Sequence, residues 1–263
     1  HYHYNPLGLI KKKNDTEYQY DPLGQLSQTS ERLYYHDAAG NPIDNHQSYD
    51  AQGRLQSDEQ HQYRYDGRGN LIEKQHKATQ AKTTYTWSLF DQLIHVSHQD
   101  DEGNTEQLHF EYDALNRRGK KSHVQGGQTT VRRYLYQSHN LVAILDESNQ
   151  LLATLIHDQA IDTPLAITTY GHEPKPLTEA EQAAWEELSE DDKNYLEQQQ
   201  TERCYYYHRD HQGSITALTD EQGKIIERFE YDAFGNITEH QKEVETHNPF
   251  AYTGREWDAA TGL

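Results

Sequence analysis

A seven-residue phrase decides the fold of this chain, and its clearest copy reads Tyr65-Asp66-Gly67-Arg68-Gly69-Asn70-Leu71. In another copy, the tyrosine that begins the phrase is also the last residue of an alternating segment, Glu17-Tyr18-Gln19-Tyr20. The period of two in this segment places both tyrosines on one face of a strand. The aspartate and glycine that follow are typical of a tight turn. The carboxylate accepts backbone N–H bonds, and glycine adopts a positive φ. The leucine then begins a second strand, so the phrase predicts a β-hairpin.

The phrase recurs along most of the chain, and the aromatic residues of the first five copies lie 14 to 16 residues apart. A lone hairpin of this kind cannot bury its aromatic face. We therefore expect successive hairpins to continue into one sheet, which also reduces the number of exposed edges. The residues that define the repeat are Tyr20, Asp21, Gly24, Tyr49, Asp50, Gly53, Tyr65, Asp66, Gly69, Tyr112, Asp113, Tyr231, Asp232 and Gly235.

Some copies depart from the pattern in ways that the turn tolerates. Asparagine is expected to take the glycine position at Asn116 and Asn140, because asparagine enters the left-handed region more readily than other non-glycine residues. A second set of turns, beginning at Asp101, Asp146 and Asp220, is expected at the opposite edge of the sheet. The spacing of the two sets suits one strand between successive turns.

The composition limits both the core and the possible partners. A net charge of −19 and an apolar fraction of 33% are close to those of disordered chains. Twenty tyrosines oppose disorder, since each buries a large ring and keeps a polar hydroxyl. We expect an ordered fold with a thin, polar core. The acidic balance argues against a nucleic-acid partner, and no segment has the roughly 20 apolar residues of a membrane span.

Other features concern the origin of the chain. Cys204 is the single cysteine, which excludes an internal disulfide framework. No basic and apolar leader marks a signal peptide. The chain has no methionine and begins at His1, so we expect it to be a fragment or a processed piece.

The repeat is interrupted between Gly171 and Arg203. Thr178-Glu179-Ala180-Glu181 fits a helix capping box, and Ser189-Glu190-Asp191-Asp192 fits a second helix start. Two short acidic helices are expected here. They either pack Trp185 and Leu188 against the sheet or form a docking surface for a partner or chaperone.

Potential chemistry concentrates at His208, Asp210 and His211, the densest histidine and aspartate cluster. A metal site or an enzyme built on this cluster is one hypothesis, and turn and packing roles are the favoured one. Cys204, beside three tyrosines, is interpreted as a packing residue rather than a nucleophile. Phosphate-binding glycine loops, His-Glu-x-x-His and Gly-x-Ser-x-Gly are absent from the sequence. We expect no catalytic residue, no metal and no cofactor.

The Tyr-Asp-x-x-Gly-x-Leu phrases resemble the YD repeats of Rhs-type polymorphic toxins, of insecticidal toxin-complex C subunits and of teneurins. The segment Tyr205–Ser214 resembles an Rhs phrase of tyrosines, His, x, Asp, His, x, Gly, Ser. Asn248–Asp258 resembles the approach to the Rhs-associated core domain. The resemblance covers nearly the whole chain except about 171–203, and its C-terminal part favours bacterial Rhs proteins over teneurins. The residues that match the Rhs phrase are Tyr207, His208, Asp210, His211 and Gly213.

For the fold, the resemblance implies a mainly β protein, a spiralling antiparallel β-hairpin shell that is a fragment of a hollow cocoon, with a short inserted helical segment. The expected divisions are repeat shell over 1-170, a helical insertion over 171-203, repeat shell again over 204-247, and a truncated start of the core region over 248-263. Rhs proteins often cleave themselves at an aspartate in an Asp-Pro-x-Gly phrase downstream of the repeats. Asp21-Pro22-Leu23-Gly24 has these letters but lies in an early repeat, where it is a turn.

For the function, the resemblance implies a non-catalytic structural segment that encapsulates a C-terminal toxin domain for delivery to competing cells by type VI secretion. The implied partners are the protein's own toxin domain, the remaining shell, and a secretion-system spike or chaperone. The implied location is bacterial and exported, either secreted or delivered into a target cell. The alternative is a teneurin-like or wall-associated extracellular adhesion module that recognises glycan or protein through its tyrosines.

Overall fold

The computed structural model describes residues 2–171, 179–193, 201–258 and 260–261. The chain divides into two compact units, an N-terminal unit His1–Gln107 and a C-terminal unit Leu108–Leu263. Within the described ranges, no helix is long and apolar enough to cross a membrane. These two units are defined by how compactly the chain packs, whereas the four segments expected from the sequence are defined by its repeats. The four-segment division therefore stays a prediction.

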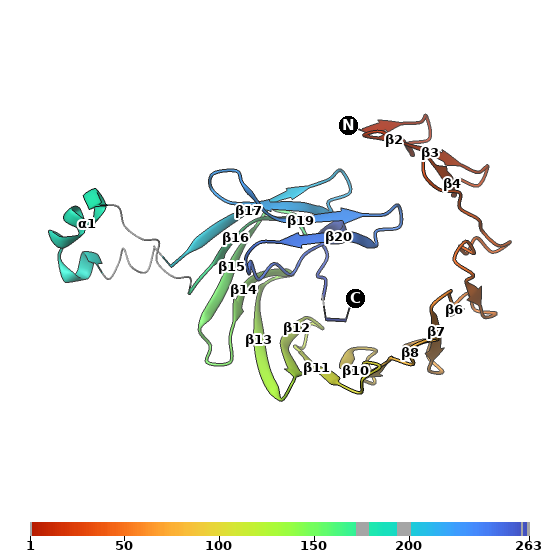
Figure 1. Ribbon diagram of the computed structural model, residues 1–263, viewed down its shortest axis with the longest axis horizontal. Helices are drawn as coiled ribbons and strands as arrows, with labels where there is room; N and C mark the ends of the chain where they lie inside the picture. The colour runs from red at the N-terminus through yellow and green to blue at the C-terminus, as the bar shows by residue number, and fades with distance from the viewer. Residues whose placement is uncertain (1, 172–178, 194–200, 259, 262–263) are drawn as a thin grey trace. The chain divides into compact units, whose positions relative to one another are not determined.

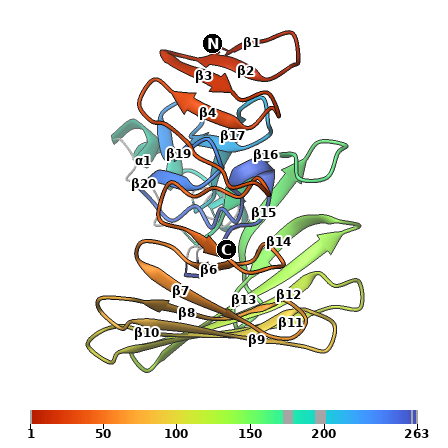
Figure 2. The same cartoon turned by 90° about the vertical axis from the view of Figure 1, so that its right-hand side faces the viewer.

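The N-terminal unit consists of short antiparallel strands in chain order. Its first four strands form a sheet of their own, and the later ones pair each with the next (Figure 2). The strands are β1 (Tyr2–Tyr4), β2 (Ile10–Lys13), β3 (Thr16–Tyr20), β4 (Leu26–Thr29), β5 (Ser48–Tyr49), β6 (Leu55–Ser57), β7 (His61–Tyr65), β8 (Leu71–His76), β9 (Lys82–Trp87) and β10 (Leu93–Gln99).

The C-terminal unit is a curved antiparallel sheet with longer strands (Figure 1). Strands β5 to β20 follow one another in sequence order within one 16-stranded sheet, so every strand between its two edges pairs with its predecessor and its successor. This confirms the mainly β hairpin fold with a short helical insert. The elements are β11 (Thr105–Tyr112), β12 (Arg118–Gln125), β13 (Gln128–Gln137), β14 (Asn140–Leu145), β15 (Leu151–His157), β16 (Pro164–Thr169), α1 (Glu179–Glu186), β17 (Arg203–Arg209), β18 (Ile215–Thr219), β19 (Ile225–Tyr231), β20 (Ile237–Lys242) and a 3-10 turn η1 (Tyr252–Gly254).

Burial differs sharply between the two units. Within the described part of the N-terminal unit only Thr29, Tyr85 and Val96 are buried. That unit is held mainly by backbone ladders and half-buried rings, since it has almost no closed core. The C-terminal unit has one apolar cluster on the concave face of its sheet, formed by Leu141, Ile144, Ala153, Leu155, Ile167, Tyr205, Tyr207, Ile215, Leu218, Ile226, Phe229, Phe250 and Ala251.

Two of the sequence-based turn predictions are wrong in detail. The turn expected to begin at Asp101 begins at Asp100, whose Oδ1 accepts the backbone N–H of Asn104 at 2.8 Å. Strand β10 ends at Gln99, so the first of the two aspartates occupies the turn position. Asn140 is not the glycine substitute, because it pairs with Gln137 as the first residue of β14. The loop between them has only two residues, and Ser138 takes the positive φ of 55°.

The insert contains α1 and a second helical stretch at 190–193. The predicted second helix start is confirmed, because Ser189 Oγ accepts the backbone N–H of Asp192 at 3.2 Å and donates to its carboxylate at 2.6 Å. The first predicted cap depends on Thr178, which lies outside the described residues.

Candidate functional site: turns, tyrosine ties and a C-terminal strap

The aspartates of the repeat build the turns. Asp66 Oδ1 accepts the backbone N–H groups of Arg68 and Asn70, both at 2.9 Å, while Gly69 has a φ of 93°. These bonds favour the ionised carboxylate, and the one from Asn70 contributes most to holding the pKa of Asp66 below its usual value. The carboxylates are therefore occupied by backbone groups. The same pair of backbone bonds recurs at Asp21, Asp50, Asp113 and Asp232.

Four tyrosines of the repeat each tie their hairpin to the one before it. The hydroxyl of Tyr65 donates to the carbonyl of Leu55 at 3.0 Å, the residue that opens the second strand of the preceding hairpin. Trp87 stands in the tyrosine position, and its indole Nε1 donates to the carbonyl of Leu71 at 2.7 Å. The sequence predicted the packing of these rings but could not predict the bond, because alternation gives the face of a residue and not its partner. The same tie is made by Tyr20 to Ile10, Tyr49 to Pro42 and Tyr231 to Ile215.

The Rhs-like phrase divides between the core and a turn. Tyr207 is buried in the core and donates its hydroxyl to Asn248 Oδ1 at 2.9 Å. Asp210 Oδ1 accepts the backbone N–H of Ser214 at 2.9 Å, and Gly213 has a φ of 85°. His208 is exposed and bonds to a threonine on the neighbouring strand.

The arrangement separates the histidines and the aspartate that the metal hypothesis grouped together. His211 is exposed at the tip of the turn, whereas Asp210 faces the backbone of that turn. In the parts of the chain that the structure describes, no group of three or more His, Cys, Asp or Glu side chains is arranged to hold a metal ion.

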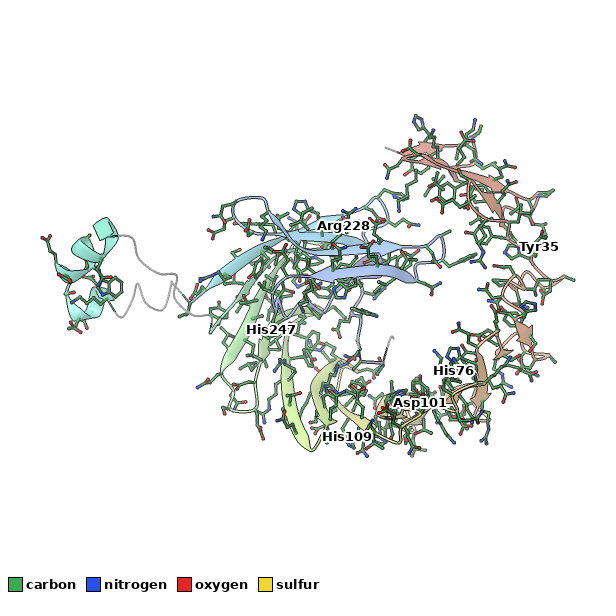
Figure 3. The ribbon with its side chains drawn as sticks, viewed as in Figure 1. Tyr35, His76, Asp101, His109, Arg228 and His247 are labelled. Atoms are coloured by element: carbon green, nitrogen blue, oxygen red, sulfur yellow. The ribbon has the colours of Figure 1, made fainter. Side chains whose placement is uncertain are left out.

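After β20 the chain turns back across the concave face of the C-terminal unit, and we call residues 246–258 the strap (Figures 1 and 3). The Rhs-like phrase receives it. Ser214 Oγ accepts the backbone N–H of Thr253 at 3.0 Å, and the N–H of Ile215 donates to the carbonyl of Ala251 at 2.9 Å. The Phe250 ring is 3% exposed and lies edge-on to the ring of Tyr207.

Two glycines allow the strap to approach this closely. At Gly235 (φ 88°) a β-carbon would collide with the ring of Tyr252 in the strap. At Gly254 (φ 72°) a β-carbon would collide with the carbonyl of Asp162. Both positions therefore require glycine for space as well as for conformation.

The far end of the strap is held by a buried ion pair. The Asp258 side chain is 3% exposed and lies 2.6 Å from Lys121 Nζ and 3.3 Å from Arg118 Nη1. Both cations project from β12. The contact joins residues 137 and 140 positions apart in the chain.

Further polar contacts line the path of the strap. Glu256 Oε1 accepts the hydroxyl of Tyr136 at 2.9 Å. Burial, followed by this carboxylate, raises the pKa of the Tyr136 phenol. Glu227 is 2% exposed and accepts from His240 Nε2 at 2.8 Å and from Thr246 Oγ1 at 2.5 Å. Burial of a carboxylate is tolerated here because both of its oxygens have donors.

A cavity of about 280 Å³ lies between the strap and the sheet, lined by side chains of both charges. Its carboxylates at Glu227, Glu256 and Asp258 are each engaged by the donors described above. The arrangement holds the strap against the sheet through apolar packing at Phe250 and through ion pairs and hydrogen bonds around the cavity. Sequence analysis identified the strap as a phrase but missed its anchors on β12 and β13, since nothing local marks a partner more than 100 residues away.

A sheet of consecutive hairpins with Tyr-Asp turns, and with a strap held on its concave face, defines a YD-repeat shell. The sequence matches the family model described as "Teneurin YD-shell" over residues 3–169 and the one described as "RHS protein" over residues 204–241. The chain belongs to the teneurin YD-shell family, and the second match confirms the resemblance to Rhs proteins.

Among curated proteins, the chain is similar to the tRNA3(Ser)-specific nuclease WapA of Bacillus spizizenii, with 24% identity over 189 residues. The match covers 72% of this chain and 7% of that protein. The tRNA nuclease WapA of Bacillus subtilis strain 168 is 38% identical over 60 residues, which cover 22% of this chain and 3% of the relative. This chain thus corresponds to a small part of these relatives.

Among solved structures, the chain is similar to the Photorhabdus luminescens Tc holotoxin pore, with 18% identity and a TM-score of 0.43. The match covers 100% of this chain and 17% of that one. The TcdB2–TccC3 crystal structure without its hypervariable C-terminal region gives 14% identity and a TM-score of 0.39, covering 100% of this chain and 19% of that one.

Proposed function

We propose that this chain is a wall segment of an Rhs-type toxin and that the wall encloses the toxin's own C-terminal domain until delivery. The observation that carries the proposal is the strap. Its last anchor, Asp258, is fixed on the concave face by Lys121 and Arg118. A domain joined to the strap would start its path from that face, inside the curve of the sheet.

The composition of the wall supports the same role. The sheet of the N-terminal unit has almost no closed core, and its turns use aspartate carboxylates that satisfy backbone groups. A wall with solvent on both faces can be polar on both and still be held by hydrogen-bonded ladders. The names of the relatives, tRNA nucleases, support a toxin as the enclosed domain.

We also propose that this segment has no catalytic role of its own and needs no cofactor. Asp210 is occupied by the turn it builds, and Tyr207 is occupied by the strap. The carboxylates beside the cavity are engaged in ion pairs and hydrogen bonds. Any toxin activity and self-cleavage would then belong to other parts of the protein.

The second part of the proposal concerns the route by which the toxin is delivered. Export to competing cells through a type VI secretion system, with a spike protein or a chaperone as partner, would make this wall a carrier in interbacterial competition. Deletion of the spike gene in the producing strain should abolish killing of a competitor, and undiminished killing would exclude this route.

Limited proteolysis of the parent protein tests enclosure. We expect the C-terminal domain to resist proteinase K in the intact protein and to be digested when it is produced alone. Digestion at equal rates would contradict enclosure. Glycan binding by residues 1–263, with no enclosed domain in the parent protein, would support the adhesion module instead.

A further inference from the structure

The convex face of the C-terminal unit carries an uncharged surface, which we call the outer patch. Side chains alternate between the two faces of a strand, so residues next to core positions point outward. About a quarter of the chain is charged, yet two adjacent cross-strand rows contain no charge. The outer patch is the row Leu135, Ala143, Thr154, Thr168 and Cys204 and the row Ile156, Ala166, Tyr206 and Thr219.

The largest side chains of the outer patch are apolar and exposed, and they flank the buried Ala143 and Ala166. Ile156 is 62% exposed, Leu135 51% and Tyr206 45%. Soluble proteins rarely expose contiguous apolar surface of this kind unless something covers it. Because six neighbouring strands, β13 to β18, contribute, the patch is broad enough for a helix to lie across.

The two ends of the insert join the sheet at the edge of the outer patch. It leaves the sheet after β16 and returns at β17, where Thr169 pairs with Arg203. The next register pair along these strands is Thr168 with Cys204, which belongs to the patch. Nine residues, 170–178, separate β16 from α1, and a chain of nine residues spans at most about 30 Å. Such a tether places α1 at an effective concentration of about millimolar near the patch, far above that of a second molecule at micromolar concentration.

The chemistry of the two surfaces is complementary. The insert carries Trp185 and Leu188, apolar side chains that are only half-buried within it. The exposed remainder of its helices is acidic and would be repelled by most of a chain with a net charge of −19. The outer patch has no acidic residue, and Arg133 and Arg228 stand on the strands at its borders.

We propose that the insert folds back onto the convex face, with Trp185 and Leu188 packed on the outer patch. The shell segment then has the strap on its concave face and an acidic helical cover on its convex face. The cover removes exposed apolar surface from the outside of the wall, where a second copy or another protein would otherwise bind.

The only thiol of the chain lies within the outer patch and reports on the cover. Cys204 lies on the same face of β17 as Tyr206 and is partly exposed. Its rate of reaction with a thiol reagent can be measured in the native sequence of 263 residues. In the double variant Trp185→Ala, Leu188→Ala we expect the Cys204 thiol to react about tenfold faster than in the native protein. A tenfold change corresponds to about 1.4 kcal/mol of lost protection by the insert.

A matched control is Leu115→Ala, which removes an exposed side chain of the same unit in a turn far along the chain from the insert. Its thiol rate should equal that of the native protein, and the far-UV spectra of all variants should agree. An unchanged rate in the double variant would overturn the proposal. Protection that grows with protein concentration would also overturn it, because a second copy would then cover the patch.

Discussion

Replacement of Asp258 by asparagine tests whether the strap is held by its terminal ion pair. The side chain is 3% exposed, and its two cationic partners are 17% and 24% exposed at Lys121 and Arg118. Removing one member of a fully buried pair costs about 3–5 kcal/mol because a buried charge loses its partner. Here both cations retain some access to water, and asparagine still accepts one hydrogen bond. We therefore expect a loss of about 2 kcal/mol in the stability of the strap.

The assay is denaturant unfolding followed by tryptophan emission in a Trp87→Phe, Trp185→Phe background, in which only Trp257 remains. The ring of Trp257 lies 5.4 Å from that of His240 and 6.1 Å from that of Phe229. Trp257 should become solvent-exposed at a lower denaturant concentration in Asp258→Asn. The matched control is Glu243→Gln, which breaks a solvent-exposed pair with Lys224 and should leave the unfolding midpoint almost unchanged. Equal effects of the two substitutions would refute the assignment of Asp258 as the anchor.

Three further predictions concern the repeat. Tyr65→Phe should destabilise the N-terminal unit by about 1 kcal/mol in urea unfolding, since the carbonyl of Leu55 loses its donor. Gly235→Ala should cost more than Gly69→Ala by thermal unfolding: both have a positive φ, which costs about 1–2 kcal/mol, but only the first would also collide with Tyr252. Stability should depend on pH at both extremes, which urea midpoints between pH 2 and 12 will show. Carboxyl groups whose pKa is lowered in the folded state stabilise the fold above about pH 4. This contribution is lost as the pH falls through their pKa values in the folded state. A urea midpoint that does not change at acid pH would contradict the role of these aspartates in the turns. Burial raises the pKa of the Tyr134 phenol to about 12, so its contribution is present below about pH 10 and is lost as the pH rises through 12. The carboxyl groups concerned are those of Asp37, Asp50, Asp66, Asp100 and Asp113.

The sequence predicted most of the local structure because the repeat is a local signal. Asp66 and Gly69 fix a turn within four residues, and the alternation before Tyr65 fixes the strand. The prediction of turn positions was wrong where two adjacent aspartates could both begin the turn, as at Asp100 and Asp101. It was also wrong where the loop has fewer residues than the usual turn of the repeat, as before Asn140. Alternation alone cannot decide either case, since both depend on where the preceding strand ends.

The contacts of the strap could not be predicted, because they join distant parts of the chain. Asp258 was identified within a phrase, but Lys121 lies among several cations on β12 and no pattern selects it. The hydroxyl bonds of the repeat tyrosines were missed for a related reason. The ring of Tyr231 was expected to pack, and its bond to the carbonyl of Ile215 depends on how consecutive hairpins twist.

The strictly sequential pairing of the strands has a consequence for how the chain is made. Each hairpin needs only its predecessor as a template, so the sheet can grow from the N-terminus while the rest of the chain is still being synthesised. The pairing of Lys121 with Asp258 is different, because it must wait for 137 further residues. The strap can therefore be anchored only after the strands that it contacts have been made.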